Sequence, residues 1–159
     1  MHEYFCYIRM LHYIIYISKA AKLLTEVELI DLLEESRAWN LNHGITGMLM
    51  YLEGNFSKVF EGRFIQVLEG SKDEVTAIFQ QIKKDKRHRE ILLLKEAESN
   101  SRAFEDWAMG FRGMNLADYE AIPGCFPLEN LVSKNAELMD SNIPYHFLKS
   151  FYQMSQTKI

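Results

Sequence analysis

A glutamine in the middle of an apolar strand pattern is the residue of this chain whose chemistry most needs an explanation. Residues 63–70 read RFIQVLEG, and strand alternation places Gln66 on one face between Phe64 and Leu68. The opposite face is apolar too, so the amide is expected to be buried. A buried amide without partners costs ~1–3 kcal/mol, so a polar group must meet it. A glutamine satisfied within the core is the simple interpretation, and an amide that meets a ligand is the alternative.

Other polar residues also stand in apolar surroundings. Tyr16 lies inside the strand pattern LHYIIYIS. Ser36 and Asn40 fall on the apolar stripe of a predicted helix, because successive helical residues turn by about 100°. The polar turn DKRH, at positions 85–88, follows a second predicted helix. Together these residues predict a polar-lined ligand pocket between a sheet and its helices.

The elements that must position these residues are predicted from periodicity and from two capping boxes, Thr25–Glu28 and Ser71–Glu74. In chain order we expect a strand at 11–18, a helix to about 42, strands at 45–52 and 63–70, a helix from 71, and strands at 91–98 and around 107–112. This β-α-β-β-α-β-β order predicts an α+β sandwich of ferredoxin-like type, with two helices on one face. Two short amphipathic helices, at 126–139 and 145–154, are expected to form a C-terminal helical cap on the exposed face of the sheet.

Composition excludes several classes of function. A chain of 159 residues with 48% hydrophobic and 25% charged residues is typical of one soluble globular domain. The net charge of −4 gives no basic footprint, so direct nucleic-acid binding is not expected. The two cysteines make no disulfide framework, which favours a reduced, cytoplasmic setting. The apolar start is interrupted by Arg9 and His12, so we expect neither a membrane segment nor a signal peptide.

The usual catalytic patterns are also missing from the sequence. The five histidines are scattered without metal-ligand spacing, and no metal site is expected. There is no phosphate-cradling glycine loop and no nucleophile elbow.

Five segments, in order, carry a specific resemblance: IIYIS, LLEESRAWNLNHGITGMLMY, RFIQVLEG, KKDKRH and FEDWAMGF. They resemble the BLUF family of blue-light sensors that use FAD. The resemblance covers residues 11–113, which would be the flavin-binding domain. Residues 1–10 would then be an N-terminal extension and 114–159 a C-terminal cap or output segment.

The resemblance implies roles for two residues at the photochemical centre. Tyr16 would give an electron and then a proton to the excited flavin. Gln66 would hydrogen-bond between that tyrosine and the flavin edge. An amide carries donors at one end and an acceptor at the other, so its rotation or tautomerisation exchanges what it offers to the flavin.

The resemblance also implies the residues that bind the cofactor and pass on the signal. Asn40 would bind the polar rim of the flavin through its amide, with Ser36 one turn before it on the same stripe. The flavin would be lined from the second helix's far end by Asp85, Arg87 and His88. Trp107 and Met109 would transmit the signal; two apart on a strand, they are expected to share a face.

A local repeat leaves a question of register. FSKVFEG and FIQVLEG lie eight residues apart, so the first copy carries Lys58 where the second carries Gln66. We choose Gln66, because only an amide has the needed chemistry and its distance from the DKRH turn fits the family. Residues 53–62 are then expected to form an extended loop. Trp39 is a departure, since family members often carry a polar residue there, and it puts one flavin contact in doubt.

Three functions compete. A light sensor would perform reversible photochemistry and signal to a separate protein in trans, with self-association as a further outcome. A flavoenzyme would turn over a substrate, but we find no acid/base set for one and expect no enzymatic activity. A light-insensitive regulatory module would have the same fold and an empty pocket.

Overall fold

The computed structural model describes residues 10–56, 58–123 and 144–149. Its elements are β1 (Leu11–Ala20), α1 (Glu26–His43), β2 (Thr46–Phe56), β3 (Val59–Gly70), α2 (Lys72–Lys84), β4 (His88–Ser99), β5 (Gly110–Asn115) and α3 (Leu116–Glu120). The predicted order of strands and long helices is confirmed. The short α3 was not predicted, although Asn115 caps it by accepting from the backbone N–H of Asp118.

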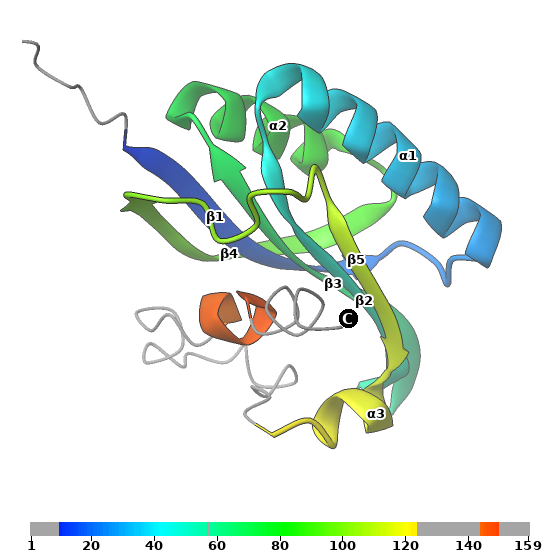
Figure 1. The fold of residues 1–159 in the computed structure, drawn as a ribbon. Coiled ribbons are helices and arrows are strands. Elements are labelled where there is room, and N and C mark those ends of the chain that lie inside the picture. Colours follow the sequence, from blue (N-terminus) through cyan, green and yellow to red (C-terminus); the bar gives the residue numbers. More distant parts are fainter. Residues whose placement is uncertain (1–9, 57, 124–143, 150–159) are drawn as a thin grey trace, which may run out of the picture.

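The strands form one sheet in the order β4-β1-β3-β2-β5. Neighbouring strands run antiparallel, except that β5 runs parallel to β2. Figure 1 shows α1 and α2 together on one face of this sheet. The predicted ferredoxin-like sandwich is therefore confirmed, with β5 added at one edge.

Strand alternation divides the apolar residues into two cores. Tyr16 of β1 and Phe64 of β3 belong to the cluster between the sheet and the helices. Ile15 and Ile65, their neighbours in sequence, belong to the cluster on the opposite face. Gln66 is paired with Tyr16 across β1 and β3 and lies on the helix side, with Phe64 and Leu68 of the same strand face; alternation alone leaves the choice of side open.

Helix α1 begins and ends where its sequence signals predict. Thr25 and Glu28 form the reciprocal capping box. Gly44 ends the helix in the left-handed conformation, with φ of 65°, and its N–H donates to the carbonyl of Asn40. The register fixed by these two caps turns Leu33 and Asn40 toward the sheet, where both are buried.

The face without α1 and α2 is partly covered by helical residues 144–149 (Figure 1). Tyr145 stacks on Tyr13 of β1 with ring centroids 4.6 Å apart, and Phe147 contacts Tyr119 edge-on. The predicted cap is confirmed for these residues. The helix predicted at 126–139, and the end of the one predicted at 145–154, lie outside the described residues.

The loop predicted for residues 53–62 is wrong. Strands β2 and β3 continue as a hairpin until Phe56 pairs with Val59, and Lys58 sits in the turn with φ of 73°. The first copy of the repeat contains the turn of this hairpin. Phe56, at the end of β2, is buried, and the guanidinium of Arg63 lies 4.1 Å from its ring centroid. This packing stabilises the extended hairpin relative to a loop.

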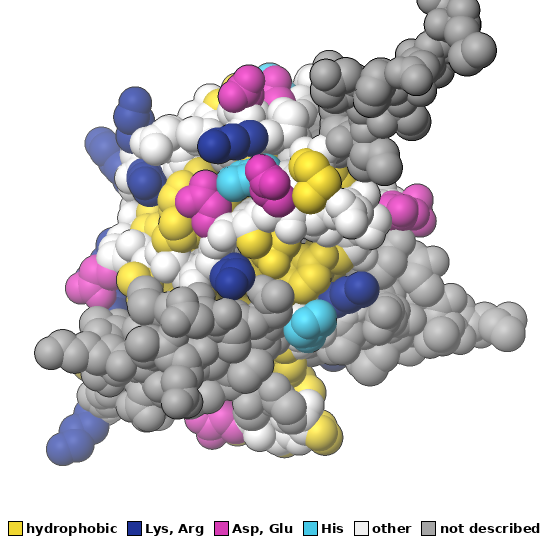
Figure 2. Space-filling view, turned by 90° about the vertical axis from the view of Figure 1, so that its left-hand side faces the viewer, with side chains coloured by type: hydrophobic (Ala, Val, Ile, Leu, Met, Phe, Trp, Pro, Cys, Tyr) yellow, Lys and Arg dark blue, Asp and Glu magenta, His cyan; other side chains and the backbone are white. Residues whose placement is uncertain are grey.

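Within the described residues, no helix is long and apolar enough to cross a membrane, and no three His, Cys, Asp or Glu side chains gather in a way that could hold a metal ion. On the face drawn in Figure 2, acidic and basic side chains lie among hydrophobic ones.

Candidate functional site: a cavity between the sheet and α1

A cavity of about 460 Å³ lies between α1, α2 and the sheet. This volume falls within the range of small-molecule sites. Its lining includes six of the residues predicted to bind the cofactor: Ser36, Asn40, Gln66, Asp85, Arg87 and His88. The remaining lining is mostly apolar, as in other ligand sites: Leu32, Leu49, Leu68, Ile78 and Ile82.

Gln66 is the polar group at the sheet wall of this cavity. Its Oε1 accepts a hydrogen bond from the Tyr16 hydroxyl, and its Nε2 donates to Met109 Sδ at 3.3 Å. The amide is 5% exposed, so both of its ends are used while the residue remains buried. The polar partner that the sequence demanded is therefore Tyr16, together with a weak sulfur acceptor.

Tyr16 lies behind Gln66 and is not itself part of the cavity lining. Burial raises the pKa of the Tyr16 phenol well above its usual range, and the negative charge of Asp85 raises it further. The phenol therefore keeps its proton at any ordinary pH and acts as the donor in the bond to Gln66. The Tyr16 ring also packs against Phe79 of α2, with centroids 5.4 Å apart.

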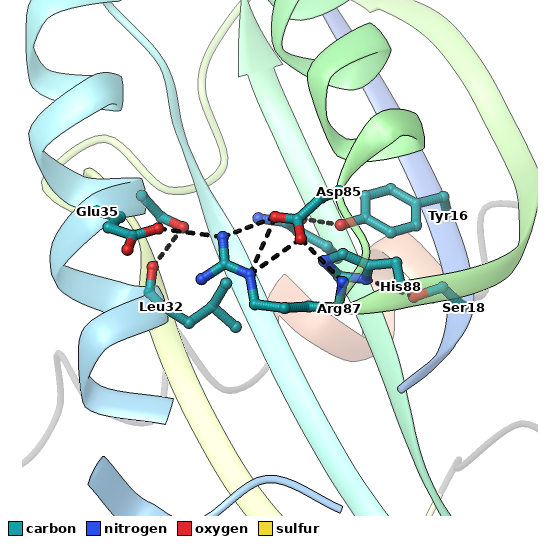
Figure 3. A network of polar contacts seen from close by, with 9 residues as sticks. Tyr16, Ser18, Leu32, Glu35, Asp85, Arg87 and His88 are labelled. Carbon is teal, nitrogen blue, oxygen red and sulfur yellow. Dashed lines mark hydrogen bonds and ion pairs between the residues drawn. The ribbon is translucent and has the colours of Figure 1, made fainter. Parts of the chain in front are cut away.

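Residues 85–88 build the polar wall that faces α1 (Figure 3). Arg87 binds both carboxylate oxygens of Asp85 through Nε and reaches Glu35 of α1 at 3.1 Å. Burial alone would raise the pKa of Asp85, but its hydrogen bonds to Arg87 and that charge hold the pKa below its usual value. The arginine thus ties the loop after α2 to α1 across the cavity.

His88 completes this wall. Its Nδ1 lies 2.9 Å from the Ser18 hydroxyl, and its ring packs against Phe64 with centroids 4.6 Å apart. Burial lowers the pKa of His88 to about 4, against the opposing effect of Asp85. The imidazole is therefore neutral near pH 7, and the Ser18 hydroxyl is placed to donate to it.

Asn40 and Ser36 are both in the lining, but Asn40 Nδ2 and Ser36 Oγ already donate to protein carbonyls. Asn40 Nδ2 donates to the carbonyl of Ala108 at 2.6 Å, and Ser36 Oγ donates to Leu32 O at 2.8 Å. Arg37, which the sequence analysis did not single out, donates from Nε to Met109 O at 3.0 Å. Helix α1 thus holds the backbone of residues 108 and 109. No sequence signal marks Arg37, because its partner is a distant carbonyl.

The expected common face of Trp107 and Met109 is wrong. Strand β5 begins only at Gly110, so strand alternation does not apply to the residues before it. Met109 is buried in the cluster beneath the helices, whereas Trp107 packs against the cluster on the opposite face. Trp107 lies directly over Gly110, where a Cβ would come within 2.1 Å of the indole. The expected contact of Met109 with Gln66 is present.

The cavity suits a partly polar ligand. Trp39 lines it and stacks on His43 with centroids 3.8 Å apart. Its Nε1 is buried without a hydrogen-bond partner among the described residues. With the amides of Asn40 on α1 and Gln66 on the sheet also in the lining, the cavity fits a ligand rich in ring nitrogens and carbonyls.

The chain is similar to several known proteins that respond to light or carry a BLUF domain. Photoactivated adenylate cyclase subunit alpha of Euglena gracilis is 29% identical over 77% of this chain, and the chain spans only 11–13% of the length of such curated relatives. The dark-state structure of BlrB, a BLUF protein, is 26% identical with a TM-score of 0.67, covering 94% of this chain and 99% of that one. Klebsiella pneumoniae BlrP1, solved with FMN and cyclic diGMP, is 32% identical over 65% of this chain and 26% of its own, with a TM-score of 0.56.

A family model described as BLUF, sensors of blue-light using FAD, matches residues 11–110. This span holds β1 through the start of β5 and every residue of the cavity lining. The chain therefore belongs to the BLUF family of flavin-based blue-light sensors.

Proposed function

We propose that this chain senses blue light through FAD in the cavity, with Tyr16 and Gln66 as the photochemical pair. The observation that carries the proposal is the buried sequence of contacts from the Tyr16 hydroxyl to Gln66 and on to Met109. A bound flavin would supply light absorption and would accept an electron and a proton from Tyr16. Because the Tyr16 hydroxyl donates to Gln66, which lines the cavity while Tyr16 does not, we expect the amide to pass a change in the phenol on to the cavity.

The amide of Gln66 has two distinguishable arrangements in this environment. In the structure Oε1 faces the phenol and Nε2 faces the sulfur of Met109. Rotation would exchange these ends, so Met109 would meet Oε1 in place of an N–H donor; tautomerisation would instead move one proton from Nε2 to Oε1, which would make Oε1 a donor. The exchange needs no backbone movement. A leucine or a lysine at this position could not make it.

FAD is proposed as the flavin because the matching family model is described as sensors of blue-light using FAD. Lys84 is exposed and lines the cavity, so its ammonium can meet a flavin phosphate, which FAD and FMN both carry. Arg87 is less available, because Asp85 and Glu35 already bind it. Extraction of the bound cofactor and chromatography against FAD and FMN standards tests this directly; recovery of FMN alone would contradict it.

The photochemical proposal is tested by Gln66→Leu and Tyr16→Phe in the flavin-loaded protein. Each variant should retain flavin but lose the reversible red shift under blue light. Gln81→Leu is the matched control, since it makes the same chemical change in the same cavity lining and should keep the shift. A shift that survives in Gln66→Leu would refute the role of the amide, and a shift lost in Lys58→Leu would point to the other copy of the repeat.

The same measurements separate the competing functions. Steady bleaching by NAD(P)H with turnover would identify a flavoenzyme. A purified chain that takes up no flavin would identify a light-insensitive module. Neither result is expected, because the cavity, the phenol and the amide are all in place.

For output, we propose that the signal leaves through the face away from α1 and α2, toward a separate protein or a second copy of the chain. Trp107 and Tyr145 both pack on that face, while Met109 contacts Gln66 on the other. Hydrogen exchange of residues 144–149 should therefore differ between dark and illuminated protein. Equal exchange in both states would count against this route.

A further inference from the structure

The segment from Arg102 to Met109 joins β4 to β5 and carries both Trp107 and Met109. Its C-terminal end is held by Arg37 and Asn40, which bind the carbonyls of Met109 and Ala108. The Gly47 N–H also donates to Trp107 O at 3.0 Å. The position of Met109 against Gln66 then depends on what fixes the other end of this segment.

A single buried carboxylate fixes that end. Glu69 of β3 is 2% exposed, and its two oxygens accept hydrogen bonds from the backbone N–H groups of Ala103 at 2.9 Å and Phe104 at 2.8 Å. The Thr46 hydroxyl donates to the same carboxylate at 2.7 Å. The buried carboxylate thus has three donors, two of which are backbone N–H groups of the turn, and these bonds hold the turn rigidly.

Arg102 fastens the same turn from its outer side. Its guanidinium donates to Thr46 Oγ1 at 2.9 Å, to the carbonyl of Glu69 and to the carbonyl of Gly44 at 2.7 Å. The turn is thereby tied to the beginning of β2 and to the end of α1. Glu69 also lies near the opposite face, since its charge, after burial, helps raise the pKa of Tyr145 to about 12.

Gln66 and Glu69 stand three residues apart on β3, on opposite faces of the strand. Gln66 contacts Met109 at one end of the segment, and Glu69 binds Ala103 and Phe104 at the other. We propose that Glu69 is a positioning residue for the photochemical site: its carboxylate fixes the start of the 102–109 segment and thereby sets how Met109 sits against Gln66. The kinetic consequence drawn below rests on the proposed function.

Glu69→Gln is the sharp perturbation, because it preserves size while removing one acceptor. Both carboxylate oxygens accept a backbone N–H, whereas an amide has only one acceptor end. Whichever way the amide turns, its NH₂ faces the N–H of Ala103 or Phe104. One of these bonds is replaced by a contact between two donors, so the turn should open more often.

Three readouts follow in the flavin-loaded protein. Amide hydrogen exchange at Ala103 and Phe104 should rise by about tenfold or more in Glu69→Gln. The ¹³C methyl resonance of Met109, assigned by its loss in Met109→Leu, should shift. The rate of dark recovery after blue light should change by about threefold or more, while the amplitude of the red shift stays as in the wild type.

Thr46→Ser is the matched control. It keeps the hydroxyl that donates to Glu69 and accepts from Arg102, and it leaves both backbone N–H bonds, so the three readouts should stay within about twofold of the wild type. If Glu69→Gln does not fold, Arg102→Met is the second variant, because it loosens the same turn from its outer side. It must raise amide exchange at Ala103 and Phe104 and shift the Met109 resonance, as expected for Glu69→Gln.

The outcomes separate this proposal from the proposed function. Unchanged exchange and an unchanged Met109 resonance in Glu69→Gln would overturn the positioning role. Faster exchange with an unshifted Met109 resonance would overturn it as well, since the carboxylate would then hold the turn without placing Met109. A wild-type protein that shows no red shift would refute the light-sensor function, while exchange and the Met109 resonance would still decide the role of Glu69.

Discussion

Acidification should destabilise this chain through His88, and the size of the effect can be worked out from the structure. The imidazole lies between Ser18 and Phe64 and is largely buried. Burial, the largest effect, lowers the pKa of His88 to about 4; Asp85 raises it and Arg87 lowers it. In the unfolded chain the same group titrates near its ordinary value of 6.5. The folded chain must therefore hold His88 neutral over a range where the unfolded chain binds a proton.

The sign follows from proton linkage. Above the unfolded pKa both states leave His88 neutral, so the full stability is present. Between about 6.5 and about 4 the unfolded state binds more protons, and stability falls as the pH falls. Below about 4 both states are protonated and the loss is complete. Since one pKa unit corresponds to about 1.4 kcal/mol, the whole loss is about 3 kcal/mol, of which about 2 kcal/mol accrues between pH 7 and pH 4.5.

Urea unfolding of the flavin-free chain measures this loss without a contribution from ligand binding. His88→Gln replaces the imidazole by a group that does not titrate in this range, so the fall in unfolding free energy should be about 2 kcal/mol smaller than in the wild type. Ser18→Ala is the control: it removes the partner of Nδ1 but keeps the imidazole, so it should retain the wild-type slope. Parallel curves for wild type and His88→Gln would refute the reasoning.

Three further perturbations test other parts of the structure. Gly47→Ala would place a Cβ 2.0 Å from the carbonyl oxygen of Val67, so urea unfolding should record a loss of about 2 kcal/mol or more; wild-type stability would show that the hairpin yields at no cost. Glu61→Gln removes the charge that binds the buried Arg63 at 2.9 Å and should cost about 3 kcal/mol, and a neutral effect would mean that solvent reaches the guanidinium. Asn40→Ala should weaken flavin binding about tenfold in equilibrium dialysis, and an unchanged Kd would show that Asn40 does not contribute to flavin binding.

Local pattern predicted the parts of the fold that depend on one element at a time. Alternation along β3 grouped Gln66 with Phe64 and Leu68, which lie together beneath the helices, and the capping box at Thr25 set the register that buries Asn40. These predictions succeeded because the backbone alone decides which way a side chain points. Resemblance then grouped residues from separate elements into one site, which periodicity by itself does not do.

The errors arose where distant contacts decide the local structure. The β2–β3 hairpin extends to Phe56 because Arg63 packs over that ring, a contact that neither residue signals alone. Trp107 and Met109 point to opposite faces because the chain bends before Gly110, with Trp107 O bound by Gly47. A two-residue spacing gives a common face only inside a strand.

The position of Asn40 connects cofactor binding to the same bend. Its Nδ2 already donates to Ala108 O at 2.6 Å, so a ligand in the cavity can meet the Oδ1 of Asn40 freely but can use Nδ2 only by competing with that carbonyl. A flavin bound through Oδ1 would leave the 102–109 segment held as it is, with Met109 against Gln66. A flavin bound through Nδ2 would release Ala108 and leave Arg37 as the α1 side chain that holds the end of the segment. The seating of Met109 is therefore linked to how the cofactor binds, even before any light is absorbed.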